Sequence, residues 1–283
     1  MTGSEFSAAW ARVRRGSVHQ TLHGVGCYTL PALSAVPYVS HGFSDRTGGV
    51  STGCFQSMNL SLTRKDDPDR GLENYRLVAA AMGFSFDSMA SDHYAHGTAV
   101  RRVDGRDRGK GFTKPLLPSC DGLVTNDPGV TLITGHADCM AFFCVDPVRR
   151  AVGLAHAGWR GALGRIGGVL IETMQSEFGS DPAELLLGVG PSICPACFEV
   201  DPDVGDLFRD AFPDLPCILP GKPGKEHVDL WMVALAQFLE AGALPEHVSL
   251  ADVCTVETEN QSSHRRDKGK TGGMAAFLRL TDR

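Results

Sequence analysis

Cys139 and His156 lie at the two ends of one predicted hairpin, which brings a thiol and an imidazole close together. Two apolar runs, Met140 to Val145 and Ala151 to Ala155, are separated by the turn signal Asp146-Pro147, so the strands are expected to pair antiparallel. Opposed residues of such a pair have Cα atoms about 4.5 to 5.5 Å apart, which lets one zinc ion bridge both side chains. A register shift by one residue would turn the two side chains to opposite faces.

A third metal ligand has to come from elsewhere in the chain, and our choice is His96, followed by Gly97. Spacing alone does not distinguish it from three other histidines, which are His41, His93 and His136. One thiolate and two imidazoles leave the fourth tetrahedral position of zinc to water, which ionises near neutral pH in catalytic sites. A structural alternative fits composition equally well: Cys139 would be a buried strand cysteine and His156 a hydrogen-bonded core histidine.

Residues on both sides of this pair suggest further roles. Asp138 precedes the cysteine and, near a strand end, can turn into the same cleft as a general acid or base; alternatively it caps or orients a loop. After the histidine, Gly158 and Gly161 bracket Trp159-Arg160 at an expected helix start, which favours binding of a phosphate or another anion. Arg160 would assist this binding or form an ordinary surface ion pair.

Three other segments carry residues whose types suit ligand binding or catalysis. The run from His41 to Ser51 places Arg46 before two glycines, which suits an oxyanion or phosphate, although it lacks the P-loop spacing and a Gly-Gly turn is often only a turn. Arg266 lies in a basic segment, 262–273, that would meet an anionic substrate or form a solvated loop. Cys194 and Cys197 form a CxxC without a second CxxC, which favours a structural interpretation over a zinc ribbon or redox site.

Composition narrows the class of protein. The chain has 283 residues, 42% of them hydrophobic, so it is long enough to fold around its own core. Nine cysteines, an odd number, favour a reducing compartment over a disulfide framework, so we expect a cytoplasmic protein. No membrane span or signal-peptide core is recognisable. A net charge of −6 argues against a general nucleic-acid binder, which leaves a small-molecule substrate as the expectation.

The pattern of elements predicts an α+β chain. Helices are expected at 72–82, after capping carboxylates at 66–69 and before Gly83, at 159–178 as the longest helix, and at 229–241. Strands besides the hairpin are expected at 131–134, 184–189, 248–253 and 275–280. Residues 1–36 lack clear periodicity and are expected to be a loosely attached N-terminal extension before a catalytic domain, 37–283.

Several motifs together resemble those of the YfiH family, also called laccase-domain, polyphenol-oxidase-like or FAMIN-related. The motifs are HGFSDR and TGGVS (41–51), MNL (58–60), HG (96–97), ADC (137–139), HAGWRG (156–161) and GPSI (190–193). The resemblance covers residues 37–280 and implies one α+β domain with layered mixed β-sheets and outer helices. It also implies one zinc ion bound by His96, Cys139 and His156, and an Arg46 that contacts phosphate.

The resemblance further implies a purine nucleoside phosphorylase that also cleaves methylthioadenosine and deaminates adenosine. Its substrates would be purine nucleosides and phosphate; the oligomeric state stays open. Copper would bind the same ligands in vitro, but a copper-dependent polyphenol oxidase fits worse, because multicopper centres use His-x-His pairs and this chain has none. Two departures from the family pattern bear on substrate preference: Tyr94-Ala95 stands where Gln-Val is usual, and Gly273 where an arginine is common.

Two alternatives of other classes remain. Cys139 could act as a thiolate nucleophile paired with His156, in a cysteine-dependent amide hydrolase or deamidase whose substrates include a cell-wall precursor amide. A metal-binding partner module without catalytic activity is the other. Stoichiometric zinc would weaken the first alternative, and dependence of activity on Asp138 and Arg46 would weaken the second.

Overall fold

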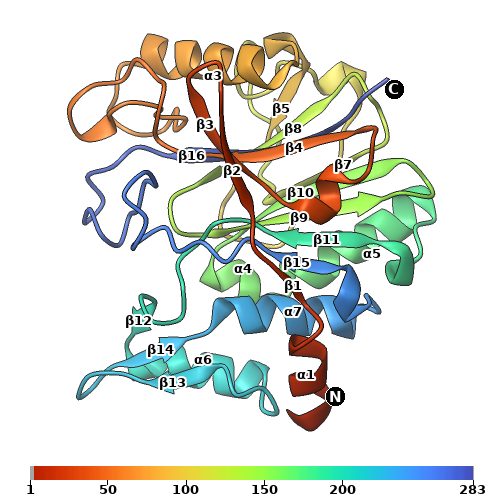
Figure 1. Cartoon of the computed structure of the whole chain (residues 1–283), viewed down its shortest axis with the longest axis vertical. Coiled ribbons are helices and arrows are strands. Elements are labelled where there is room, and N and C mark those ends of the chain that lie inside the picture. The colour runs from red at the N-terminus through yellow and green to blue at the C-terminus, as the bar shows by residue number, and fades with distance from the viewer. Residues whose placement is uncertain (1–2, 283) are drawn as a thin grey trace.

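The computed structural model describes residues 3–282, which form two packed β-sheets with helices on both outer faces (Figure 1). The seven-stranded sheet has the order β1 (Arg14–Arg15), β15 (Val248–Leu250), β11 (Leu186–Val189), β9 (Met140–Asp146), β10 (Ala151–Ala157), β7 (Gly122–Thr125) and β6 (Val100–Arg102). The six-stranded sheet has the order β2 (Val18–Leu22), β3 (Val25–Thr29), β4 (Val39–Ser44), β16 (Met274–Leu280), β8 (Thr131–His136) and β5 (Met89–Ser91). Both sheets are mixed, which confirms the expected α+β class.

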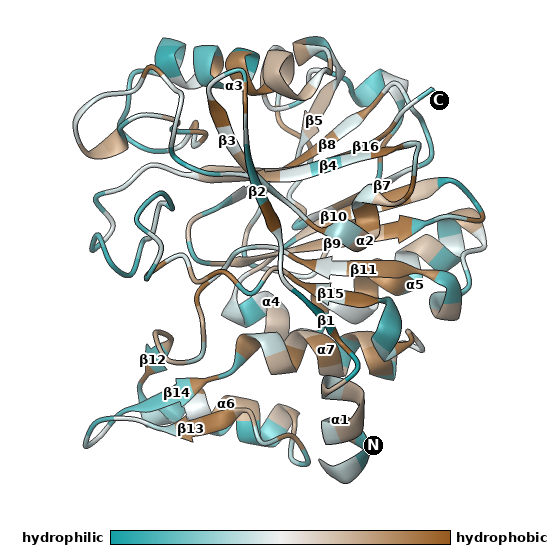
Figure 2. Ribbon diagram, in the orientation of Figure 1, coloured by the Kyte–Doolittle hydropathy of each residue, from teal (hydrophilic) through white to brown (hydrophobic). Residues whose placement is uncertain are grey.

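The core lies in three layers of apolar side chains. Between the sheets, Phe143 and Leu154 of the hairpin pack in one cluster with Leu132 and Leu278 of the other sheet. A second cluster fills the space between the seven-stranded sheet and the helices α5 (Ile166–Phe178) and α7 (Leu230–Glu240), and a third lies under α3 (Pro68–Met82). Figure 2 shows hydrophobic residues along the central strands and α7, and hydrophilic residues in the long loops.

The predicted helix at 72–82 and the predicted helix at 229–241 are confirmed as α3 and α7. Asp67 caps α3 by accepting a hydrogen bond from the Asp69 backbone N–H, and Gly83 ends it with φ of 72°, a left-handed conformation that glycine adopts without strain. The hairpin and the other four strands are confirmed too, as β9–β10, β8, β11, β15 and β16.

The prediction of one helix over 159–178 is wrong. The chain forms α4 (Trp159–Leu163) and then α5, because Arg165 between them adopts a left-handed conformation with φ of 62°. Its guanidinium pairs with Glu240 at the end of α7 and donates to the carbonyl of Ala211 at 2.9 Å. These contacts with distant segments hold a conformation that local sequence disfavours.

The prediction of a loosely attached extension at 1–36 is wrong for its described part. β1 pairs with β15 in one sheet, and β3 pairs with β4 in the other. Phe6 of α1 (Gly3–Trp10) is buried in the helix-side core, and Leu33 of α2 (Pro31–Ser34) lies between the sheets. The missing periodicity reflects short strands of two to five residues, too short to show a repeat.

A smaller unit lies beside the main body and consists of α6 (Pro202–Ala211) with a three-stranded antiparallel sheet, β12 (Glu199–Val200), β14 (Glu226–Val228) and β13 (Ile218–Pro220), ordered as written (Figure 1). It is inserted between β11 and α7. Within residues 3–282, none of the helices combines the length and the apolar character that crossing a bilayer requires.

His41, one of the histidines considered as a metal ligand, has a structural role on β4. Its Nε2 accepts the Leu30 backbone N–H at 2.9 Å, and its ring packs edge-on against Phe143. The side chain is 5% exposed, and burial lowers its pKa from 6.5 to about 4. The native imidazole is therefore neutral over a pH range in which the unfolded state binds a proton.

We expect acid to destabilise the protein through His41. The contribution of His41 to the free energy of unfolding is complete above pH 6.5. It falls as pH drops towards about 4, because only the unfolded state gains a proton there, and the loss amounts to about 3 kcal/mol. Gln at position 41 should flatten this slope, whereas His23→Gln, at an exposed turn, should leave it unchanged. Urea unfolding at several pH values measures the effect, and equal slopes in wild type and His41→Gln would contradict it.

Candidate metal site and substrate cavity

Three predicted ligands meet in space. The ligand atoms of His96, Cys139 and His156 lie within 4.8 Å of one another. His156 is on β10 and 2% exposed, Cys139 directly precedes β9, and His96 is in the loop between β5 and β6 with φ of 58°. The other three histidines considered lie outside this group; His136, for example, contacts Thr134 and the Cys139 carbonyl through its two ring nitrogens.

The hairpin brings Cys139 and His156 together diagonally, not directly opposite as the sequence suggested. In the ladder His156 pairs with Ala141, and Ala157 pairs with Met140. Cys139 is two positions from the direct partner of His156. Because side chains alternate with period two, a two-residue offset keeps both on the same face of the sheet.

Asp121, which the sequence analysis missed, organises both histidines. Its Oδ1 lies 3.3 Å from His156 Nδ1, and its Oδ2 accepts the backbone N–H groups of Ala95 at 3.1 Å and Gly97 at 2.8 Å. One carboxylate thus orients the His156 ring and shapes the turn that carries His96. The only local signal was an acidic residue directly before a buried strand, β7.

The charges around this carboxylate shift its pKa and that of its partner. Burial alone would raise the pKa of Asp121, but hydrogen bonds from His156 and from two backbone amides outweigh it and lower the pKa. Burial alone would lower the pKa of His156, but the Cys139 sulfur and Asp121 raise it to about 10. For His96, burial and the nearby His156 charge lower the pKa.

We expect Asp121→Asn to weaken metal binding about 10- to 100-fold, the usual effect of losing a carboxylate behind a ligating histidine. The amide can accept fewer of the three hydrogen bonds that the carboxylate accepts, so the His96 turn and the His156 ring lose their fixed orientation. Chelator competition measures the affinity. Asp127→Asn in another loop is the control, and unchanged affinity in Asp121→Asn would contradict the orienting role.

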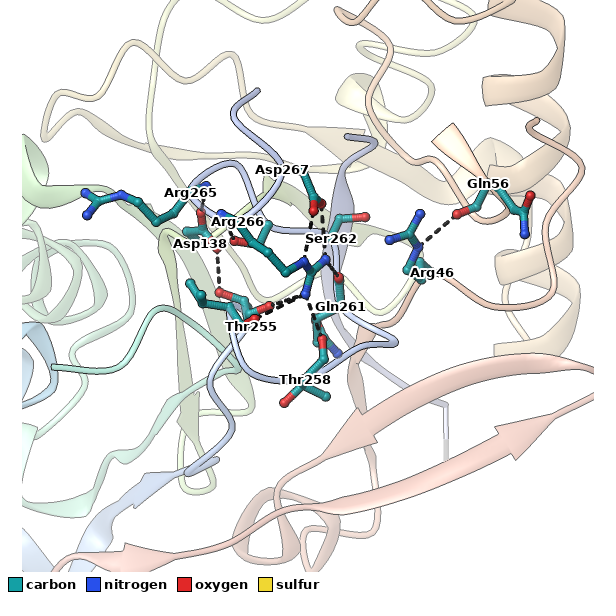
Figure 3. Close-up of polar contacts among 12 residues, drawn as sticks. Arg46, Gln56, Asp138, Thr255, Thr258, Gln261, Ser262, Arg265, Arg266 and Asp267 are labelled. Carbon is teal, nitrogen blue, oxygen red and sulfur yellow. Dashed lines mark hydrogen bonds and ion pairs between the residues drawn. The ribbon is translucent and has the colours of Figure 1, made fainter. Parts of the chain in front are cut away.

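Asp138 directly precedes Cys139 and so lies beside the three candidate ligands. Its φ of 88° turns the side chain away from a regular strand direction. Oδ1 accepts the Thr255 hydroxyl at 2.6 Å, and Oδ2 accepts the Arg265 backbone N–H at 2.7 Å (Figure 3). Each oxygen retains acceptor capacity, so the carboxylate is fixed in place and still able to take a proton or bind a ligand.

A cavity of about 700 Å³ opens over these groups, a size suited to a small-molecule site. Its lining includes all three candidate ligands and Asp138, together with Gly158. Three arginines line it as well, namely Arg64, Arg160 and Arg265. Aromatic side chains complete the wall: Tyr75, Tyr94, Phe112, Trp159 and Phe198.

The other two predicted arginines lie outside the residues that line this cavity. Arg266 was expected to bind substrate, but its guanidinium is fully used inside its own loop: it pairs with Asp267 and donates to four backbone carbonyls, those of Thr255, Val256, Thr258 and Gln261 (Figure 3). Its neighbour Arg265 lines the cavity, and one guanidinium nitrogen of Arg265 donates to the carbonyls of Cys197 and Glu199. Arg46 donates from Nε to the Gln56 carbonyl at 2.9 Å, on a separate loop.

Two departures from the family pattern have structural consequences here. The Tyr94 ring lies 4.6 Å from the His156 ring and 5.6 Å from the His96 ring, so an aromatic side chain partly covers the ligand group. At Gly273 a Cβ would come within 2.9 Å of the Ser61 Cβ. An arginine at 273 would therefore require the Ser61 segment to move.

The donor set fits a metal ion. Two imidazoles and one thiolate are the ligands that zinc prefers, and three protein ligands are typical of a catalytic zinc site. Asp121 supplies the carboxylate behind a ligating histidine that such sites commonly have.

Two packed mixed sheets with a nitrogen-and-sulfur ligand group opening into a cavity define an α+β protein with a candidate catalytic metal site. Residues 40–281 match the family described as "Multi-copper polyphenol oxidoreductase laccase", and the chain belongs to this family. It is 36% identical over 244 residues to the purine nucleoside phosphorylase YlmD of Geobacillus stearothermophilus, covering 84% of this chain and 88% of that one.

Two further comparisons agree with this assignment. The adenosine deaminase RL5 of an unknown prokaryotic organism is 30% identical over 218 residues, which cover 75% of this chain and 83% of RL5. The crystal structure of YfiH from Bacillus licheniformis superimposes with a TM-score of 0.84 at 29% identity, covering 92% of this chain and 97% of YfiH. The resemblance to the YfiH family is therefore confirmed.

Proposed function

We propose that this protein is a zinc-dependent purine nucleoside phosphorylase with adenosine deaminase and methylthioadenosine phosphorylase activity. The observation that carries the proposal is one cavity in which the group His96, Cys139 and His156, the fixed carboxylate of Asp138 and three arginines meet. The printed names of relatives that process purine nucleosides support the substrate class.

The cavity supplies what phosphorolysis of a nucleoside needs. Arg64, Arg160 and Arg265 attract phosphate, and Arg46 stays a predicted contributor from its separate loop. Trp159 and Phe198 offer apolar faces for a planar purine. Holding phosphate and the ribose anomeric carbon in one site supplies much of the rate enhancement through orientation.

Asp138 is the residue to which we assign proton transfer. Its hydrogen bonds from Thr255 and Arg265 leave acceptor positions free towards the cavity, so it can take a proton from an attacking oxygen or return one to a departing base. When zinc is bound by His96, Cys139 and His156, it supplies a Lewis acid beside these groups.

Product analysis tests the proposal directly. Zinc-loaded protein is incubated with adenosine, inosine or methylthioadenosine, with and without phosphate, and the free bases, adenine and hypoxanthine, are resolved from inosine. We expect phosphate-dependent release of adenine from adenosine and from methylthioadenosine, and phosphate-independent formation of inosine. Zinc-loaded protein that turns over none of these nucleosides would overturn the proposal and favour the cysteine-dependent amide hydrolase.

A further inference from the structure

A second group of metal-ligand side chains lies apart from the one described above. Cys194, Cys197, Cys254 and Glu257 place one ligand atom each within 4.8 Å of one another. From the sequence only the CxxC pair was apparent, and a structural interpretation was favoured because no second pair exists. The fold supplies two more ligands from a segment about 60 residues further along the chain.

Strand topology explains why these segments meet. β11 and β15 are adjacent parallel strands, so the chain leaves both at the same edge of the sheet. The pairing continues past the strand ends as a parallel bridge between Ser192 and Cys254. The CxxC turn with Cys194 and Cys197 follows β11, and the segment with Cys254 and Glu257 follows β15. Each strand therefore leads into a segment that carries two of the four ligands.

The local hydrogen bonds bring the donors together. Backbone N–H groups of Cys197 and Phe198 both donate to the Cys194 carbonyl at 3.0 Å, which closes the CxxC turn. The Cys194 N–H donates to Cys254 Sγ at 3.4 Å, a backbone contact to sulfur typical of bound thiolates. Glu257 Oε1 lies 3.4 Å from Cys197 Sγ and 3.7 Å from Cys194 Sγ, close to the spacing of about 3.5 Å between oxygen and sulfur ligands of a tetrahedral zinc with bonds of about 2.0 Å to oxygen and about 2.3 Å to sulfur.

We propose that Cys194, Cys197, Cys254 and Glu257 bind a second zinc ion with a structural role. Three thiolates and one carboxylate close the coordination sphere, which is the form of a structural rather than a catalytic site. All three cysteines are free thiols, as this role requires. The proposal does not depend on the reaction assigned to the cavity.

Such an ion would fix one wall of the substrate cavity. Ile193 and Phe198, the residues that flank the CxxC turn, both line the cavity, as does Arg265 of the loop that continues from Glu257. Arg265 also donates to the carbonyls of Cys197 and Glu199, at 3.3 and 2.7 Å, and its guanidinium lies over the Phe198 ring. The ion would link these two segments through their side chains. Arg265 already links them through hydrogen bonds to backbone carbonyls.

Metal stoichiometry in the full-length protein tests the proposal. After zinc loading and desalting, we expect two zinc ions per chain in wild type and in Cys54→Ser, an exposed cysteine outside both groups. Cys139→Ala and Cys254→Ser should each retain one, and the double variant none. One zinc per chain in wild type, lost completely in Cys139→Ala, would overturn the proposal, as would a Cys194–Cys197 disulfide found by mass spectrometry in freshly purified protein.

A milder variant covers the case in which Cys254→Ser fails to fold. Glu257 is exposed, so Glu257→Gln should fold, and in the Cys139→Ala background it should bind zinc more than about tenfold more weakly in chelator competition. Cobalt in the same background should show thiolate-to-metal charge-transfer absorption. Unchanged zinc affinity in Glu257→Gln together with no such absorption would contradict the site.

Discussion

Cys139→Ala is expected to lose both the metal at the His96–Cys139–His156 group and phosphorolysis, with kcat/KM falling at least about 10³-fold. Removing the only thiolate leaves two imidazoles, which hold zinc far more weakly than three ligands. The Lewis acid beside the scissile bond is worth several kcal/mol, and each 1.36 kcal/mol is about tenfold in rate. Zinc content and adenine release from adenosine plus phosphate are measured on the same samples.

Cys54→Ala is the matched control, because this cysteine is exposed and outside the cavity lining. It should retain metal and activity. A Cys139→Ala protein that keeps full activity after losing the metal would show that the metal has no part in the reaction. Rapid alkylation of Cys139 in zinc-loaded wild type, with loss of activity, would instead favour the thiolate nucleophile.

Asp138→Asn is expected to lower kcat about 10²- to 10⁴-fold while leaving the metal content unchanged, because a positioned acid or base contributes that much and Asp138 is not a metal ligand. Asn tolerates the left-handed conformation that this position adopts with φ of 88°, so the backbone should persist. Single-turnover rates and zinc content of the variant are the measurements.

Asp252→Asn is the control for this variant. Asp252 also has a left-handed conformation, with φ of 58°, but it is exposed and outside the cavity lining. It should behave as wild type. If Asp138→Asn lost its metal or melted well below the control, then the carboxylate would only hold Thr255 and the Arg265 backbone in place, and its assignment to proton transfer would be wrong.

Features whose causes are local could be predicted from sequence. Capping by Asp67 and the left-handed Gly83 mark α3 because both act within a few residues. The hairpin follows from two apolar runs and one turn, and it alone brings Cys139 near His156. The HAGWRG and ADC motifs indicated the protein family, and the comparisons confirm it.

Features whose causes are distant could not be predicted. Arg165 breaks a continuous helical pattern because Glu240 and Ala211, 75 and 46 residues away, hold its conformation. Asp121 reaches His156 across 35 residues, and Cys254 reaches the CxxC turn across 60. The local sequence marks Asp121 only as an acidic residue before a buried strand, and it does not indicate either contact.

The helices and strands with strong local signals, the family, and a short set of residues suited to binding or catalysis were predictable from the order of residues alone. Which members of that set share one cavity depends on how the sheets and loops pack. Arg265 and Arg266 show this difference: they are adjacent and of one residue type, yet Arg265 lines the cavity and donates to carbonyls at and after the CxxC turn, whereas Arg266 donates to carbonyls of its own loop. Side-chain direction at such positions is set by backbone conformation and by partners far along the chain, so it exists only once the sheets have packed.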